Sequence, residues 1–313
     1  MKKFQNLRPI KDMKIDRKIS VNNIVNQMYD SGGFTAKKLG IGVDILERMV
    51  KDKDCLKFLS FPACIIATGT RGVIKELVKR KLFDVFITTC GTLDHDLARV
   101  WKDYYHGSFN VDDKELYKKH IGRLGNIFIT DKSYGITVEK KVTEFLKEIY
   151  AESKRELSTH ELVWEIGKRI DNKDSILYWC CRNKIPVIIP GITDGAVGYQ
   201  IWQFSQDHDL KIDILQDEQL LSDLIWNAKK SGALIIGGGI SKHHVIWWNM
   251  MKGGLNYAVY VTTAQEFDGS LSGARMREAV SWGKLKGSAK YVTIDGDATV
   301  ILPIMFSALL QRL

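Results

Sequence analysis

Hydrophobic and polar positions divide the chain into two regions with different periodicities. In the first 60 residues, apolar side chains recur about every 3.6 positions over 20–30 and 43–52, which is typical of amphipathic helices. Gly32 and Gly33 lie between these segments and predict a break. From Cys64 onward, short apolar runs rich in Val and Ile alternate with helix-period segments, so this region combines strands and helices.

Six of the apolar runs end in small or polar residues and are predicted strands. They cover 64–70, 85–92, 187–195, 233–240, 258–270 and 291–299. The clearest helices between them cover 73–82, 161–170 and 219–230, and Ser158 with Glu161 forms a capping box before the second.

The alternation of strands and helices predicts the fold class. Strands that are apolar throughout are buried on both faces, and the helices between them imply right-handed crossovers. We therefore predict an α/β fold with a doubly wound, mostly parallel sheet. A helical extension over 1–60 would precede an α/β catalytic domain over 61–313.

The composition is that of an ordinary globular protein, with 45% hydrophobic and 27% charged residues among 313. The longest apolar runs are far shorter than the ~20 residues that cross a membrane, and the basic N-terminus lacks the apolar stretch of a secretory signal. We therefore expect no membrane partner. The net charge of +9 comes without a nucleic-acid-binding motif, so we also expect no direct nucleic acid partner.

Five cysteines without CxxC spacing predict neither disulfides nor a metal site, and they fit a reducing, cytoplasmic location.

The loops that follow the predicted strands hold most of the unusual residues. In open α/β sheets, ligands bind beyond the carboxyl ends of the strands, and glycines there let backbone N–H groups approach a phosphate. The dinucleotide fingerprint GxGxxG is absent. We therefore predict a nucleotide-type site built by a non-standard set of loops, at 88–96, 191–195, 237–244, 263–270 and 295–298.

Aspartates are concentrated in these same loops. Asp commonly caps helices and forms Asx turns, which is a sufficient explanation for many of them singly. Together they would instead form a negative pocket in a basic protein, which suits a polycationic small molecule. The sequence leaves both interpretations open for Asp94, Asp96, Asp194, Asp268 and Asp297.

A histidine and a lysine are further candidates for chemistry. His243 follows a triple-glycine turn at the start of a helix, where an imidazole can act as a general base; the alternative is a structural histidine. Lys284 follows Trp282 and Gly283, and such neighbours favour its neutral, nucleophilic amine. The alternative is a solvated lysine at a helix end.

The motifs SGARMREAVSWGK, GGGISKHH, TTAQEFDGS and TTCGTLDHD together resemble deoxyhypusine synthase, particularly its archaeal branch. The resemblance covers the chain from about Gly33 to Ala308. It implies a Rossmann-like fold, NAD as cofactor, and a homotetramer with active sites across the dimer interface. The implied reaction transfers the aminobutyl group of spermidine to one lysine of translation initiation factor 5A.

The resemblance also implies which residues form the site. Lys284 would be the nucleophile that forms a covalent imine, and His243 the base on the secondary amine of spermidine. The polyamine would contact Asp94, Asp194, Gly269, Glu278 and Trp282, with Asp96 in reserve. The cofactor would contact Ala63, Cys64, Ile65, Ile66, Ala67, Thr89, Cys90, Gly91, Asp194, Gly238, Thr263, Ala264, Asp297 and Ala298.

The chain departs from eukaryotic members of this family around the polyamine. They carry two acidic residues where this chain has Asp94 and His95, and aspartates where it has Tyr199 and Leu271. These departures bear on the identity of the polyamine rather than on the lysine chemistry. Two alternatives stay open: a related aminobutyl transferase with another donor or acceptor amine, as in agmatine or homospermidine-type chemistry, and an inactive NAD-binding scaffold.

Overall fold

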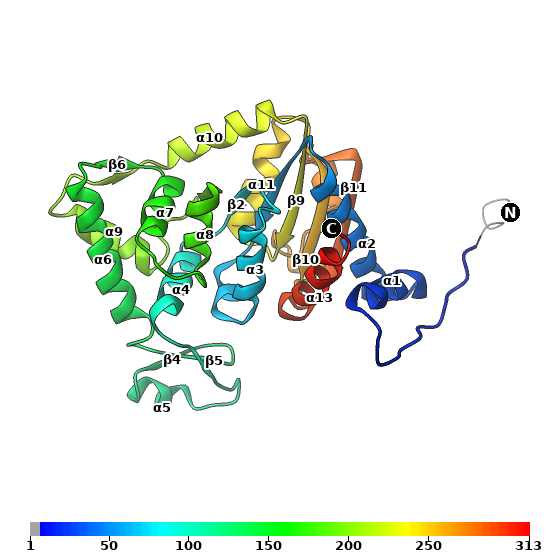
Figure 1. Ribbon diagram of the computed structural model, residues 1–313, viewed down its shortest axis with the longest axis horizontal. Coiled ribbons are helices and arrows are strands. Elements are labelled where there is room, and N and C mark those ends of the chain that lie inside the picture. The colour runs from blue at the N-terminus through cyan, green and yellow to red at the C-terminus, as the bar shows by residue number, and fades with distance from the viewer. Residues whose placement is uncertain (1–6) are drawn as a thin grey trace.

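A six-stranded sheet with parallel neighbours forms the centre of the computed structural model, which describes residues 7–313 (Figure 1). The chain starts this sheet in the middle, extends it to one side, and then returns to extend it on the other. This is the order of a doubly wound, Rossmann-like fold, as predicted, with the switch point between β1 and β9. In space the strands are β11 (Leu285–Asp295), β10 (Leu255–Thr262), β9 (Lys230–Ile236), β1 (Cys55–Ser60), β2 (Val85–Ile87) and β7 (Val187–Ile188).

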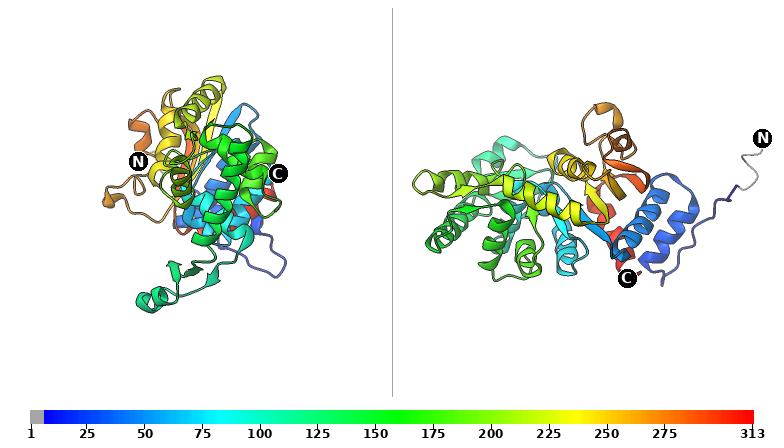
Figure 2. Two further views of the ribbon diagram at one scale, coloured as in Figure 1. Left: turned by 90° about the vertical axis from the view of Figure 1, so that its left-hand side faces the viewer. Right: turned by 90° about the horizontal axis from the view of Figure 1, so that it is seen from above.

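Helices cover both faces of the sheet. Successive strand side chains point to opposite faces, so Phe58 and Leu59 of β1 are both fully buried in different hydrophobic clusters. Views along two axes show the two helical layers (Figure 2). One layer contains α10 (Ile214–Asn227), α11 (Gly239–Met250) and the short α12 (Glu278–Ser281); the other contains α2 (Phe34–Lys51), α3 (Thr70–Lys79) and α13 (Ala298–Leu310).

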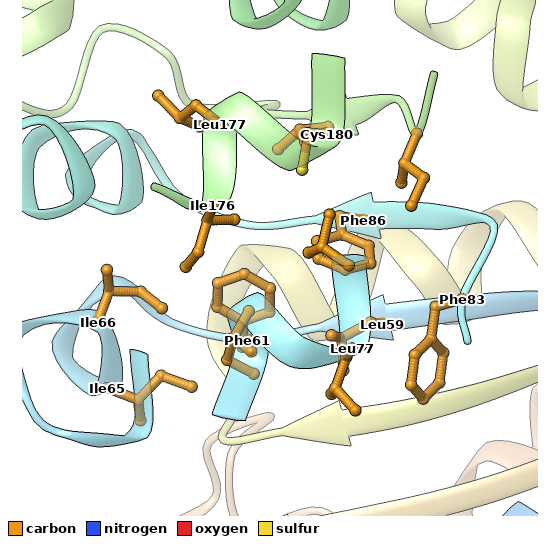
Figure 3. Close-up of a cluster of buried hydrophobic side chains, with 14 of the residues drawn as sticks. Leu59, Phe61, Ile65, Ile66, Leu77, Phe83, Phe86, Ile176, Leu177 and Cys180 are labelled. Atoms are coloured by element: carbon orange, nitrogen blue, oxygen red, sulfur yellow. The ribbon is translucent and has the colours of Figure 1, made fainter. Parts of the chain in front are cut away.

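A group of helices continues the molecule beyond β7. The predicted capping box is confirmed, because the Ser158 hydroxyl accepts from Glu161 N and the Glu161 carboxylate accepts from Ser158 N. Figure 3 shows Ile176 and Cys180 above Phe61 and Phe86, and this contact anchors the group to the sheet. Its elements are α4 (Cys90–Trp101), α6 (Gly135–Ala151), β6 (Glu156–Leu157), α7 (Thr159–Lys168), α8 (Ile176–Asn183), α9 (Ala196–Ser205) and β8 (Lys211–Ile212).

A small antiparallel unit projects from the molecule between α4 and α6, and we call residues 105–130 the arm (Figures 1 and 2). Leu116 is its one buried residue. The sequence pattern did not predict the arm, because strands without a buried face lack apolar alternation. It contains β3 (Tyr105–His106), α5 (Asp113–Lys118), β4 (Ile121–Leu124) and β5 (Ile127–Thr130).

One predicted strand is wrong. The run 64–70 forms the 3₁₀ helix η2 (Ala63–Ala67), followed directly by α3, because the hydroxyls of Thr68 and Thr70 both donate to Ile65 O and close the turn. The strand of this region is β1, which starts at Cys55, nine residues before the predicted start. Its apolar pattern is interrupted by Lys57, whose long side chain reaches out to Asp84 at 2.9 Å.

The N-terminal helices are those expected, α1 (Val21–Ser31) and α2, with Gly32 at φ 71° in the break between them. The division at residue 60 needs adjustment, because β1 is a central strand rather than part of the extension. We propose the helical part as the segment before Cys55. Its first six residues, and with them the start of the basic N-terminal stretch, lie outside the described residues.

Within residues 7–313, no helix has the length and apolar character needed to cross a membrane. The same residues contain no cluster of three or more His, Cys, Asp or Glu side chains that could hold a metal ion. All five cysteines are free.

Candidate active site

A pocket of about 470 Å³ lies at the carboxyl edge of the sheet, beside the switch point. Because the chain leaves β1 and β9 toward opposite sides, their loops diverge and leave a crevice between them. Seven of the predicted cofactor residues line the pocket: Cys64, Ile65, Gly238, Thr263, Ala264, Asp297 and Ala298. The tip of the arm closes one side with Phe109 and residues 124–127.

Close backbone packing explains the glycine loop after β9. A Cβ on Gly238 would lie 2.1 Å from Ser272 Oγ, so any larger residue at 238 would push this loop away from the loop that contains Ser272. Gly237 and Gly239 have φ values of 64° and 71°, which glycine adopts without strain. On the opposite wall, Asp297 caps α13 by accepting from Thr299 N, so the amino end of that helix faces the pocket.

The remaining predicted cofactor residues do not line the pocket, and several are buried. Ala63 packs so closely on Gly91 that a Cβ there would lie 2.9 Å away. The side chains of Ile66, Ala67 and Cys90 are in the core. Burial raises the pKa of the Cys90 thiol far above its ordinary value, so this cysteine is a neutral packing residue. Any contact that these three residues make with a ligand would involve their backbones. Thr89 precedes α4 and is partly exposed, and Asp194 is exposed.

A lysine and an imidazole lie in contact beyond β9 and β10, on the half of the sheet that these strands form with β11. Lys284 Nζ lies 3.4 Å from His243 Nε2, although the residues are 41 positions apart in the chain. His243 is the fifth residue of α11, and Lys284 lies between Gly283, whose φ is 68°, and the first residue of β11, Leu285. The structure therefore brings together the two residues that sequence analysis chose for covalent and proton-transfer chemistry.

Aromatic rings surround this pair. Lys284 Nζ lies 5.3 Å from the ring centre of Trp282 and 5.7 Å from that of Trp247, within cation–π range. The His243 ring stacks on Trp247 at 5.7 Å. Burial lowers the pKa of His243, and the positive charge of Lys284 lowers it further. His243 is therefore an unprotonated base at neutral pH, next to a lysine that is only 8% exposed.

The rim of this centre is open. Trp282 is 64% exposed, and Glu278 and Gly269 are also on the surface. The Glu278 carboxylate is thus accessible to a cationic ligand. Asp268 is committed to an Asx turn, in which its carboxylate accepts from Ser270 N and Ser270 Oγ.

Asp94 does not lie free in a polyamine pocket. Its carboxylate is 1% exposed and accepts from Ala196 N, Val197 N and the Tyr134 hydroxyl at 2.7–2.9 Å. Burial raises its pKa, while the backbone and Tyr134 donors act in the opposite direction. Its carboxylate caps α9, so Asp194 and Glu278 are the predicted polyamine ligands whose carboxylates are exposed.

Asp96, the reserve candidate, is equally committed. It is fully buried and accepts from Arg71 Nε and Ser175 Oγ, both at 2.7 Å, and from the first amides of α8. The capping interpretation that the sequence left open therefore describes Asp94, Asp96 and Asp297.

Sequence reasoning missed two residues of the lysine–histidine centre. Trp247 lies four positions after His243, and this i,i+4 spacing on a helix was a usable signal. Lys242 is buried beside His243, and nothing in its sequence neighbourhood indicated burial. The contribution of the arm to the pocket was also invisible, since it depends on tertiary structure.

The sheet order, a glycine-lined pocket at the switch point and a nearby lysine–imidazole pair define an α/β enzyme with a Rossmann-like core. The family model for deoxyhypusine synthase matches residues 23–309. The chain therefore belongs to the deoxyhypusine synthase family, whose members transfer an aminobutyl group in hypusine formation and use a dinucleotide cofactor.

Curated relatives span the same length. A protein of Picrophilus torridus named probable deoxyhypusine synthase is 55% identical over 304 residues, 97% of each chain. A relative of the same name from Thermoplasma volcanium is 53% identical, also over 97% of each chain. The crystal structure of an Entamoeba histolytica protein assigned to deoxyhypusine synthase has a TM-score of 0.66 at 21% identity, covering 96% of this chain and 97% of that one, and it shows a shared fold.

Proposed function

We propose that this protein transfers the 4-aminobutyl group of spermidine to a specific lysine of translation initiation factor 5A, with NAD as cofactor and Lys284 as the covalent intermediate. The observation that carries the proposal is the contact of 3.4 Å between Lys284 Nζ and His243 Nε2, enclosed by two tryptophan rings. Membership of the deoxyhypusine synthase family supports the reaction class.

The pocket beside the switch point fits a dinucleotide. Gly238 lets backbone approach closely, and the amino end of α13 offers N–H donors to a phosphate. NAD bound there would supply the hydride chemistry, first for oxidation of the carbon beside the secondary amine of spermidine and later for the reduction. Gly238, Thr263, Ala264 and Ala298 are the residues that we expect to hold it.

The protein supplies the proton transfer and the covalent step. His243 accepts a proton from the secondary amine as hydride leaves the neighbouring carbon, which gives a C=N bond. The Lys284 amine adds to this carbon and 1,3-diaminopropane departs, so the aminobutyl group is joined to Lys284 as an imine. The acceptor lysine repeats the exchange and frees Lys284, and hydride reduces the new C=N bond to the secondary amine of deoxyhypusine.

The walls of the centre suit a polyamine. Trp247 and Trp282 can attract cationic amines through their ring faces, and we expect the exposed Glu278 to pair with a terminal ammonium. Asp194 is the second free carboxylate among the predicted polyamine ligands. Because Asp94 is used to cap α9, and Tyr199 and Leu271 carry no charge, agmatine remains the alternative donor and homospermidine-type chemistry the alternative transfer.

We also propose a homotetramer. Large apolar side chains stay exposed along α9, α10 and α11, and the neighbouring rings of Tyr199 and Trp202 are each 55% exposed. Contiguous exposed apolar surface is typical of protein interfaces. The mass of the native protein in solution tests this, since a monomer that retains full activity would contradict it.

A labelling experiment tests the proposed function. The protein is incubated with NAD and labelled spermidine or agmatine, with and without archaeal factor 5A, and label in each protein is followed by mass spectrometry. We expect aminobutyl mass on factor 5A from spermidine and, after borohydride trapping without factor 5A, on the peptide that contains Lys284. Lys284→Arg should abolish both while NAD binding persists, because arginine stays protonated and cannot attack. Label trapped on another lysine contradicts the assignment.

A further inference from the structure

Lys242 is an unusual lysine, because it is buried to 2% exposure and its nitrogen is held by backbone rather than by a carboxylate. Nζ donates to Leu271 O at 2.7 Å and to Ala274 O at 2.6 Å, and it lies 3.8 Å from the centre of the Tyr260 ring. Burying an ammonium costs free energy unless every donor is satisfied. Here the two carbonyls and the ring face satisfy it.

The partners of Lys242 belong to one loop, residues 269–277, that runs from η3 (Glu266–Asp268) to α12. The same loop is held at a third carbonyl, since Ser272 O accepts from the Tyr260 hydroxyl at 2.5 Å and from Thr262 Oγ1 at 3.1 Å. Hydrogen bonds from Lys242 and from two side chains of β10 thus fix the path of the loop.

This loop leads directly into the catalytic segment. Glu278 begins α12, Trp282 follows its end, and Lys284 directly precedes β11. Lys242 itself precedes His243 on the first turn of α11. Its side chain therefore connects the two chain segments that carry the two members of the lysine–histidine pair.

We propose that Lys242 is a positioning residue for the aminobutyl transfer: by holding the carbonyls of Leu271 and Ala274, it sets the distance and orientation between His243 and Lys284. The proposal rests on the proposed role of Lys284 as covalent nucleophile. A displacement of about 1 Å in such a pair is enough to lower a rate about 100-fold.

The charge of Lys242 fits this interpretation. Burial lowers the pKa of its ammonium to about 7, Glu278 raises it and Arg275 lowers it. In either protonation state the nitrogen carries at least two N–H bonds for the two carbonyls, so the loop stays held across neutral pH.

Lys252 provides a matched control. Its Nζ also donates to backbone carbonyls, those of Trp226 and Ile225 at 2.7 and 3.3 Å and that of Ala228, at the end of α10. Lys252→Met therefore removes the same kind of interaction at a place that does not hold the loop 269–277.

The experiment compares the full-length wild type with Lys242→Met and Lys252→Met. For each we measure the rate of borohydride-trapped adduct formation on Lys284 at saturating spermidine and NAD, the spermidine concentration that gives half this rate, and the melting temperature. We expect Lys242→Met to lower the maximal rate at least about 10-fold while the half-saturating concentration changes less than about twofold. Lys252→Met should retain the wild-type rate even if it melts at a lower temperature.

A second variant covers the case in which Lys242→Met fails to fold. Tyr260→Phe removes the donor to Ser272 O and keeps the ring, and it should also lower the maximal rate, by a smaller factor. Wild-type rates in a folded Lys242→Met, or in Tyr260→Phe when the first variant does not fold, overturn the proposal. A wild type that forms no adduct on Lys284 overturns the proposed function, and this inference with it.

Discussion

The two halves of the carboxyl edge use similar residues for different purposes. Beyond β2, the carboxylates of Asp94 and Asp96 point inward and hold helix ends, and each has three or more donors. Beyond β9 and β10, His243, Glu278 and Trp282 face an open rim, and Lys284 lies just beneath it. The carboxylates beyond β2 stabilise the fold, which we call the scaffold half, and the residues beyond β9 and β10 are the candidates for catalysis, which we call the site half.

The difference follows from what lies within reach of each polar group. A buried carboxylate must be paired, and the amino ends of α8 and α9 together with Arg71 provide that pairing. On the other half, Glu278 and Trp282 are exposed at the two ends of the short helix α12, so these side chains meet solvent instead. An aspartate after a strand is therefore ambiguous until the neighbouring helix ends are known.

The largest expected effect separates the two halves by stability. Asp96→Asn leaves the buried Arg71 without its counter-charge, and breaking such a pair costs about 3–5 kcal/mol of the free energy of unfolding. Asp194→Asn, at an exposed carboxylate, should change that free energy by less than about 0.5 kcal/mol while weakening spermidine binding. Urea denaturation and spermidine titration of both variants measure this, and equal stability of the two would remove the distinction between scaffold and site.

Part of this division was predictable from the sequence. The α/β class with its mostly parallel sheet and the capping box at Ser158 follow from local patterns, and the choice of His243 and Lys284 follows from their neighbours and from long motifs. The pattern predicts a strand over 64–70, where the structure has a 3₁₀ helix, because periodicity cannot distinguish a short buried strand from a buried turn. The caps at Asp94 and the burial of Lys242 depend on contacts between residues 29 to 103 positions apart, which no local pattern encodes.

His95 provides a pH test of the scaffold half. Burial, and then the charge of Arg99, lower its pKa from 6.5 to about 4, and its ring contacts the Tyr104 hydroxyl at 2.9 Å. Between these two pH values the unfolded chain binds a proton that the folded protein does not, so the free energy of unfolding decreases as pH falls from about 6.5 to about 4.

His95→Gln removes this titration and should flatten the acid limb. Relative to wild type, the variant should gain on the order of 1–3 kcal/mol between neutral pH and pH 4, with no change in slope above about pH 7. Denaturation curves at a series of pH values give the difference. If wild type and variant lose stability in parallel on acidification, His95 is not a neutral buried group.

The smallest expected effect concerns the site half, at a position where this chain lacks a carboxylate. A triamine carries about three positive charges, and each needs a partner when it leaves water. Leu271 is uncharged, and its backbone carbonyl accepts a hydrogen bond from Lys242, so the backbone should keep its position when the side chain at 271 is changed.

Leu271→Asp should tighten spermidine binding in the presence of NAD by about 1 kcal/mol, roughly fivefold, as expected for a charged hydrogen bond. Leu271→Asn has nearly the same shape without the charge and should show no such gain. Calorimetric titration of the three proteins decides between these outcomes, and an aspartate that binds spermidine no better than asparagine would place the end of the polyamine away from this loop.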